Sequence, residues 1–121
     1  MAHVLVVDDD VDVAELVRTV LTIAGHSVEV AGDGRRGILA ATEHRPDLIV
    51  LDWMMPGMTG IDVCRMLRQD HSFDSTRIMM LTAKAAPADI DTAHDAGADD
   101  YVVKPFAPRD LRRRVADLLA S

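Results

Sequence analysis

The chain has 121 residues, 49% of them hydrophobic and 27% charged, which fits one globular domain with an ordinary core. Its net charge of −7 argues against nonspecific nucleic-acid binding, since neutralising phosphates requires clustered Lys and Arg. Cys64 is the single cysteine, so it forms no internal disulfide, and no apolar stretch approaches the roughly 20 residues of a membrane span. Since Met1-Ala2-His3 also lacks the features of a signal peptide, we expect a cytoplasmic protein without membrane contact.

Short apolar runs alternate with helical patterns along the chain. The predicted strands cover residues 4–7, 27–31, 48–51, 77–82 and 101–103. The predicted helices cover residues 13–24, 34–44, 61–67 and 87–96, with a last helix that buries Leu111, Val115, Leu118 and Leu119. A strand followed by a helix, repeated five times, favours a parallel sheet with helices on both faces.

Turn and capping residues separate these elements. Asp10 is expected to cap the first helix and Gly25 to end it. Arg45-Pro46 should stop the second helix, and residues 56–60, Pro-Gly-Met-Thr-Gly, should form a turn before the third. The other acidic residues interpreted as turn or capping residues are Asp12, Asp33 and Asp47.

Four of the predicted strands end at a polar residue, and in a parallel sheet these ends meet at one edge, where ligands bind. The polar residues are Asp8-Asp9, Asp52, Thr82 and Lys104. The adjacent carboxylates of Asp8 and Asp9 repel each other unless a cation lies between them. Hard oxygen ligands suit Mg²⁺, with Mn²⁺ as the alternative. The five histidines, at positions 3, 26, 44, 71 and 94, show no paired spacing, which argues against a zinc site.

Asp52, at the end of the central strand, is the natural nucleophile of this set. A carboxylate can attack phosphorus and form an acyl phosphate. A divalent cation would offset the charge on the phosphoryl oxygens, Lys104 could pair with one of these oxygens, and Thr82 could hydrogen-bond another. Alone, Lys104 or Thr82 would be interpreted as an ordinary loop or strand-end residue. Their order along the chain, together with the three carboxylates, favours a functional site.

Five segments of the chain together resemble the response-regulator receiver domains of two-component signalling. They are Val-Val-Asp-Asp-Asp (6–10), Leu-Asp-Trp-Met-Met-Pro-Gly-Met-Thr-Gly (51–60), Leu-Thr-Ala (81–83), Gly-Ala-Asp-Asp-Tyr (97–101) and Val-Lys-Pro-Phe (103–106). The stretch Pro-Phe-Ala-Pro-Arg-Asp-Leu (105–111) is similar to the winged-helix transcription-factor subfamily of receivers. No DNA-binding domain follows it here, so we expect either a stand-alone receiver or a piece of a longer regulator.

The resemblance implies a single α/β domain over residues 1–121, with a flavodoxin-like (βα)5 fold and strand order 2-1-3-4-5. It implies that Asp52 accepts phosphate from a sensor histidine kinase or phosphotransfer protein, or from a small phosphodonor. Asp9, Asp52 and the backbone carbonyl of Met54 would bind Mg²⁺ directly, and Asp8 would act mainly through water. The phosphoryl group would be held by Thr82, Ala83 and Lys104, and Lys104-Pro105 would be a cis peptide.

The same resemblance implies a switch. Thr82 would move toward the phosphoryl group, and Tyr101 would turn into the space it leaves. The readout surface would lie on the fourth helix, fifth strand and fifth helix, with Ile90, His94, Tyr101 and Val103 facing a partner. That partner would be an output protein or an effector domain, and a phosphorylation-linked homodimer remains open. The domain would not bind nucleic acid directly, and its only reactions would be self-phosphorylation and self-dephosphorylation.

Two alternatives come from other functional classes. A haloacid-dehalogenase-type phosphatase also uses an Asp nucleophile with Mg²⁺, and Asp8-Asp9-Asp10 offers its Asp-x-Asp pattern. That family requires Thr or Val where Asp12 stands, and a longer chain. A phosphate-independent adaptor could keep the fold for protein binding alone, although unneutralised adjacent carboxylates would then cost stability. Nucleotide binding is disfavoured because no Gly-rich loop follows the first strand.

Overall fold

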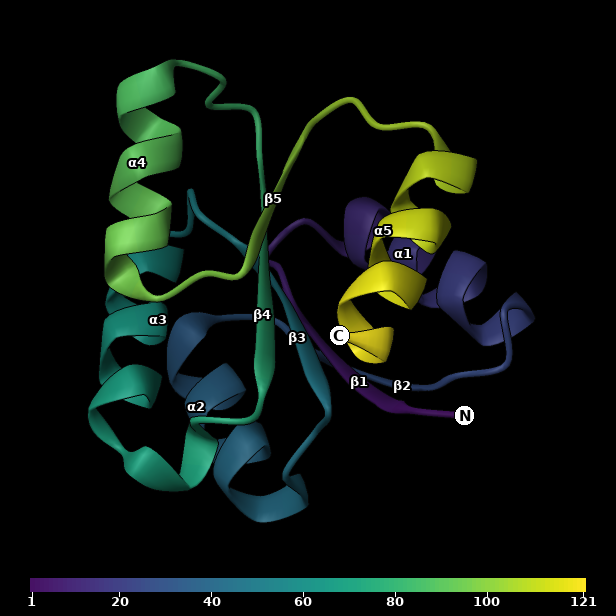
Figure 1. Ribbon diagram of the computed structural model, residues 1–121, viewed down its shortest axis with the longest axis horizontal. Coiled ribbons are helices and arrows are strands. Elements are labelled where there is room, and N and C mark those ends of the chain that lie inside the picture. The colour runs from purple at the N-terminus through teal and green to yellow at the C-terminus, as the bar shows by residue number, and fades with distance from the viewer.

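The structure, a computed structural model, describes residues 1–121 and confirms the predicted fold class. Five parallel strands form one sheet in the order β2-β1-β3-β4-β5 (Figure 1). The strands are β1 (His3–Val7), β2 (Ser27–Ala31), β3 (Leu48–Asp52), β4 (Arg77–Thr82) and β5 (Asp100–Val103). The helices are α1 (Val11–Ile23), α2 (Gly34–His44), α3 (Gly60–Gln69), α4 (Pro87–Ala96) and α5 (Pro108–Ala120), with a 3₁₀ turn (His71–Phe73) after α3.

Helices cover both faces of the sheet. Helices α2, α3 and α4 lie on one face, and α1 and α5 lie on the other (Figure 1). Alternate residues of β1 serve the two layers, since Leu5 and Val7 pack on the side of α2 whereas Val4 and Val6 pack on the side of α1. The central strands are therefore buried on both faces, which explains their continuous apolar sequence.

The predicted capping residues are confirmed at the first two helices. The Asp10 side chain accepts hydrogen bonds from the backbone N–H groups of Asp12 and Val13, at 3.0 and 3.2 Å. Asp33 accepts one from the N–H of Arg36 at 2.8 Å. These carboxylates accept hydrogen bonds from N–H groups that have no partner within the first turn of a helix. Neither therefore belongs to the acidic site.

One prediction about α5 is wrong in part. Leu111 and Val115 are fully buried, but Leu118 and Leu119 are only half-buried at the rim of the core. Both leucines lie in the last turn of the helix. None of the helices combines the length and the apolar character that crossing a bilayer requires.

Candidate functional site

The carboxyl ends of four strands bring the predicted site residues together. Asp8 and Asp9 follow β1, Asp52 ends β3, Thr82 ends β4 and Lys104 follows β5. One carboxylate oxygen from each of Asp8, Asp9 and Asp52 lies within 4.8 Å of the others. The strand register explains why these residues meet, because parallel pairing places the carboxyl ends of all four strands at the same edge of the sheet.

Lys104 joins the two buried carboxylates of the site. Its Nζ atom lies 3.3 Å from Asp8 Oδ2 and 3.2 Å from Asp52 Oδ1. The side chains of Asp8 and Asp52 are 1% and 6% exposed, whereas Asp9 is exposed at the rim. Asp8 also accepts a hydrogen bond from the backbone N–H of Asp10 at 2.9 Å. The peptide bond between Lys104 and Pro105 is cis, as the resemblance implies.

The pKa of Asp52 reflects its crowded surroundings. This pKa is raised from 3.8 to about 6, first by burial and then by the nearby Asp8 carboxylate, against the opposing effect of Lys104. The Lys104 ammonium therefore only partly compensates the two buried acids. A divalent cation among the three carboxylates would complete the compensation.

The donor atoms of the site fit Mg²⁺. Three carboxylates supply hard oxygen ligands, and Asp9 stays accessible to solvent. The backbone carbonyl of Met54 accepts no backbone hydrogen bond, so it is free to act as a further oxygen donor. No His or Cys belongs to this cluster, which disfavours a softer metal there.

Two further groups at the edge could hold an oxyanion. Thr82 is fully buried, and its hydroxyl oxygen accepts a hydrogen bond from the backbone N–H of Lys84 at 3.1 Å. The next residue, Ala83, is exposed, and its N–H donates no hydrogen bond within the protein. The Ala83 N–H lies directly after the end of β4. Lys104 is held at the same strand end, because its backbone N–H donates to the Thr82 carbonyl at 2.8 Å.

The turn after β3 positions the backbone of Asp52. The N–H of Gly60 donates to the Trp53 carbonyl at 2.9 Å. A Cβ atom at Gly60 would lie 2.1 Å from the Asp52 carbonyl oxygen, so the start of α3 requires glycine there. The sequence indicated a turn over residues 56–60 but did not show that Gly60 touches the predicted nucleophile's backbone.

Tyr101 is already turned inward. Its side chain is buried, its ring meets that of Trp53 edge-to-face at a centroid distance of 6.4 Å, and its hydroxyl donates to the Lys84 carbonyl. Lys84 Nζ lies 5.1 Å from the centre of the Trp53 ring and 3.9 Å from Asp89. Sequence reasoning missed Trp53 and Lys84 as partners of Tyr101, because neither has a spacing that links it to β5.

The residues expected to face a partner differ in exposure. His94 and Val103 are exposed, Ile90 is half-buried against the core, and Tyr101 is buried. The expectation that Tyr101 belongs to an accessible surface therefore does not describe this conformation.

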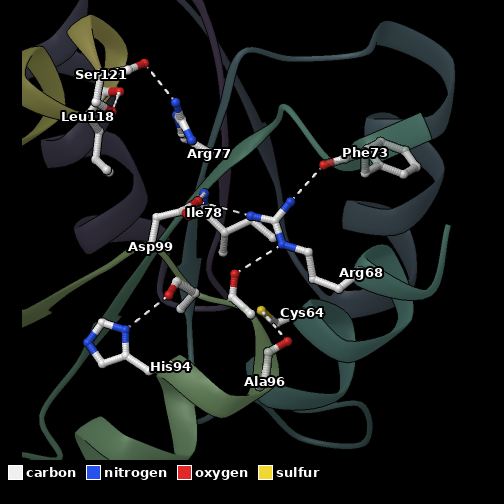
Figure 2. Close-up of polar contacts among 12 residues, drawn as sticks. Cys64, Arg68, Phe73, Arg77, Ile78, His94, Ala96, Asp99, Leu118 and Ser121 are labelled. Atoms are coloured by element: carbon white, nitrogen blue, oxygen red, sulfur yellow. Dashed lines mark hydrogen bonds and ion pairs between the residues drawn. The ribbon is translucent and has the colours of Figure 1, made fainter. Parts of the chain in front are cut away.

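Arg68, which sequence reasoning did not single out, holds the C-terminal end of α4 through the polar contacts drawn in Figure 2. Its guanidinium donates to the carbonyls of Gly97 at 3.0 Å and Phe73 at 2.6 Å, and to the Asp99 carboxylate at 2.9 Å. Asp99 in turn accepts a hydrogen bond from the N–H of Ile78, at 2.9 Å. The start of β4 and the end of α4 are thus held together, whereas the first turn of α4 has no side-chain cap.

The fold and the acidic pocket together are those of a phosphoacceptor signalling domain, and comparison with known proteins agrees. Residues 4–116 match the family model described as the response regulator receiver domain. The chain belongs to this family. Like other receiver domains it takes part in phosphorylation-dependent signalling and is not a classical enzyme. Membership of this family removes the support for the phosphatase interpretation.

Among similar proteins are regulators about twice as long as this chain. It is 49% identical to the DNA-binding response regulator MtrA of Mycobacterium leprae, over 93% of this chain and 49% of that protein. It is 46% identical to the response regulator MprA of Mycolicibacterium vanbaalenii, over 97% of this chain and 50% of that protein. The solved structure of the chemotaxis response regulator CheY4 of Vibrio cholerae matches with a TM-score of 0.93, 36% identity and 98% coverage of both chains.

Proposed function

We propose that residues 1–121 form one receiver domain in which Asp52 accepts a phosphoryl group from a histidine kinase or phosphotransfer protein. The observation that carries this proposal is the buried Asp52 carboxylate beside both Asp8 and the Lys104 ammonium. A carboxylate oxygen of Asp52 attacks phosphorus, the P–N bond of the donor's phosphohistidine breaks, and the imidazole leaves as a neutral ring after taking up a proton. Lys104 then pairs with a phosphoryl oxygen instead of a carboxylate.

The proposed metal ligands are Asp8, Asp9, Asp52 and the carbonyl of Met54. Mg²⁺, or Mn²⁺ in its place, would neutralise charge on the transferring phosphoryl group. Proximity of the three carboxylates supports this assignment. Thr82 and the N–H of Ala83 are the proposed donors to the phosphoryl oxygens that Lys104 does not reach.

The proposed switch runs through a chain of hydrogen bonds. Thr82 accepts from the N–H of Lys84, and the carbonyl of Lys84 accepts from Tyr101. When the Thr82 hydroxyl turns to donate to a phosphoryl oxygen, the segment that holds Tyr101 changes its hydrogen bonding. The effect would reach a surface on α4, β5 and α5 that includes Ile90, His94, Tyr101 and Val103.

The output of the switch is proposed to be a partner protein or an effector domain. The relatives of this chain, MtrA and MprA, are longer proteins, and MtrA is described as DNA-binding. The net charge of −7 supports protein contacts rather than direct nucleic-acid contacts for this domain. A phosphorylation-linked homodimer is a further proposed association.

Intact mass after incubation with acetyl phosphate tests the proposal. We expect a gain of about 80 Da, one phosphoryl group, that requires Mg²⁺ and is lost in Asp52→Asn. Asp74→Asn, an exposed aspartate outside the site, is the control and should behave like the wild type. A gain that survives Asp52→Asn but is lost in Asp8→Asn would instead support the phosphatase-type nucleophile.

A further inference from the structure

A second group of potential metal ligands lies at the other end of the sheet, away from Asp52. His3 opens β1, Glu29 lies on the edge strand β2, and His44 ends α2. Leu5 is paired with Glu29 in the parallel register, so Glu29 and His3 point to the same face of the sheet as Leu5. Because α2 covers this face, its last residue, His44, meets the same two side chains.

The contacts centre on the Glu29 carboxylate. His44 Nδ1 lies 2.9 Å from Glu29 Oε2, and His3 Nε2 lies 3.6 Å from Glu29 Oε1. Ligand atoms around a tetrahedral Zn²⁺ with bonds near 2.1 Å are about 3.4 Å apart, and the two contacts with Glu29 lie near this value. The two imidazole nitrogens, Nε2 of His3 and Nδ1 of His44, lie farther apart than 4.8 Å, so metal binding requires the rings to move toward each other. The rings of His3 and His44 stand edge-to-face with centroids 6.4 Å apart, so a shared ion would draw them closer.

One atom of this group is unsatisfied. Nε2 of His3 is buried, points toward Glu29 and has no hydrogen-bond partner. A buried nitrogen without a partner is costly, and a metal ion is one partner that would remove the cost. The backbone of His3 is fixed by exchange of hydrogen bonds with Asp47 at 2.8 Å, which holds the imidazole at this place.

The surroundings favour a cation. His3, Glu29, Glu43 and His44 line an open groove of about 750 Å³. Arg18 also lines this groove, but its guanidinium pairs with Glu15 at 3.0 Å. Glu43 lies 3.7 Å from Nε2 of His44, the nitrogen that faces away from Glu29, and so can orient the ring as carboxylates do for metal-bound histidines.

We propose that His3, Glu29 and His44 form a binding site for a divalent transition-metal ion such as Zn²⁺, with Glu43 as a positioning residue. Two imidazoles and one carboxylate are a ligand set that Zn²⁺ accepts, and imidazole excludes Mg²⁺ as the preferred ion. The site is separate from the acidic pocket and goes beyond the proposed phosphoacceptor function. The sequence spacing of the histidines argued against a zinc site. It could not show that the folded chain brings His3 and His44 close to each other.

The test is Zn²⁺ affinity measured by competition with a chromophoric chelator. Untagged protein carrying Asp52→Asn is used in excess Mg²⁺, so that the acidic pocket competes little for Zn²⁺. We expect one equivalent of Zn²⁺ to bind, and His3→Gln, Glu29→Gln and His44→Gln each to weaken binding about tenfold or more. Glu43→Gln should weaken it less.

His71→Gln is the matched control, because His71 also faces a carboxylate, Asp74 at 3.3 Å, but is 91% exposed and lacks a second histidine. It should change Zn²⁺ affinity by less than about twofold. Imidazole NMR signals give a readout that needs no variant: those of His3 and His44 should shift first during the titration. Failure to bind Zn²⁺ under these conditions, or binding that His3→Gln and His44→Gln leave unchanged, would overturn the proposal.

Discussion

Lys104 Nζ lies 3.2 Å from a carboxylate oxygen of Asp52, yet the pKa of Asp52 is raised rather than lowered. Burial of Asp52 and its proximity to the Asp8 carboxylate outweigh the attraction of one ammonium group. The metal-free protein therefore carries an ionised Asp52 at neutral pH at a cost to its stability. A site of this kind is adapted to take up further positive charge.

Asp52→Asn should stabilise the metal-free protein at pH 7.5, by about 1 to 3 kcal/mol. A carboxyl with a pKa near 6 in the folded protein and 3.8 in the unfolded chain binds more protons when folded, so wild-type stability falls as the pH rises from about 4 to 6. The advantage of Asn should thus vanish near pH 4. Urea unfolding in EDTA at pH 7.5 and pH 4 measures the difference in free energy of unfolding between the variant and the wild type, with Asp74→Asn as the control. An equal stabilisation by Asn at pH 4 would contradict this explanation.

Lys104→Met should destabilise the metal-free protein at pH 7.5 by about 2 kcal/mol, since two buried carboxylates lose their shared partner. In the Asp52→Asn background the loss should be smaller, because one of those carboxylates is gone. A double-mutant cycle by urea unfolding gives the coupling between the two residues. Lys84→Met, whose ammonium is 3.9 Å from Asp89, is the control and should show no coupling to Asp52.

Tyr101→Phe should loosen the segment between β4 and α4. The substitution keeps the ring against Trp53 but removes the hydroxyl that donates to the Lys84 carbonyl, at a cost of about 1 kcal/mol. Hydrogen exchange of the Lys84 amide, which donates to the Thr82 hydroxyl, should become faster, while that of the sheet stays unchanged. Uniform acceleration across the sheet would show instead that the hydroxyl contributes to global stability alone.

The strands and the acidic site could be predicted because local patterns determine them. Apolar runs that stop at Asp8, Asp52 and Thr82 identify strand ends, and parallel pairing then brings the ends together. Contacts that depend on how helices lie over the sheet could not be predicted. Arg68 binds Phe73 in the 3₁₀ turn and both Gly97 and Asp99 between α4 and β5. His3 lies near His44 because α2 covers that face of the sheet. No residue spacing encodes either meeting.

Gly60→Ala should destabilise the protein by about 2 to 4 kcal/mol, since the new methyl group would overlap the Asp52 carbonyl oxygen. Either that carbonyl or the start of α3 must shift, so labelling by acetyl phosphate should also slow. Gly32→Ala is the matched control: a Cβ atom there meets nothing within 4 Å. Thermal unfolding of both variants measures the difference, and equal melting temperatures would refute the steric account.

Arg68→Lys should destabilise the protein by about 2 kcal/mol although it keeps the charge. A single ammonium cannot replace a planar guanidinium that donates to Gly97, Phe73 and Asp99 together, so the partly buried carbonyls of Gly97 and Phe73 would lose a donor. Arg65→Lys, at an exposed position of the same helix, is the control for helix propensity and charge. Urea unfolding measures both costs, and hydrogen exchange should locate the loss at the end of α4. A cost for Arg68→Lys no larger than that for Arg65→Lys would mean that the helix is held by apolar packing alone.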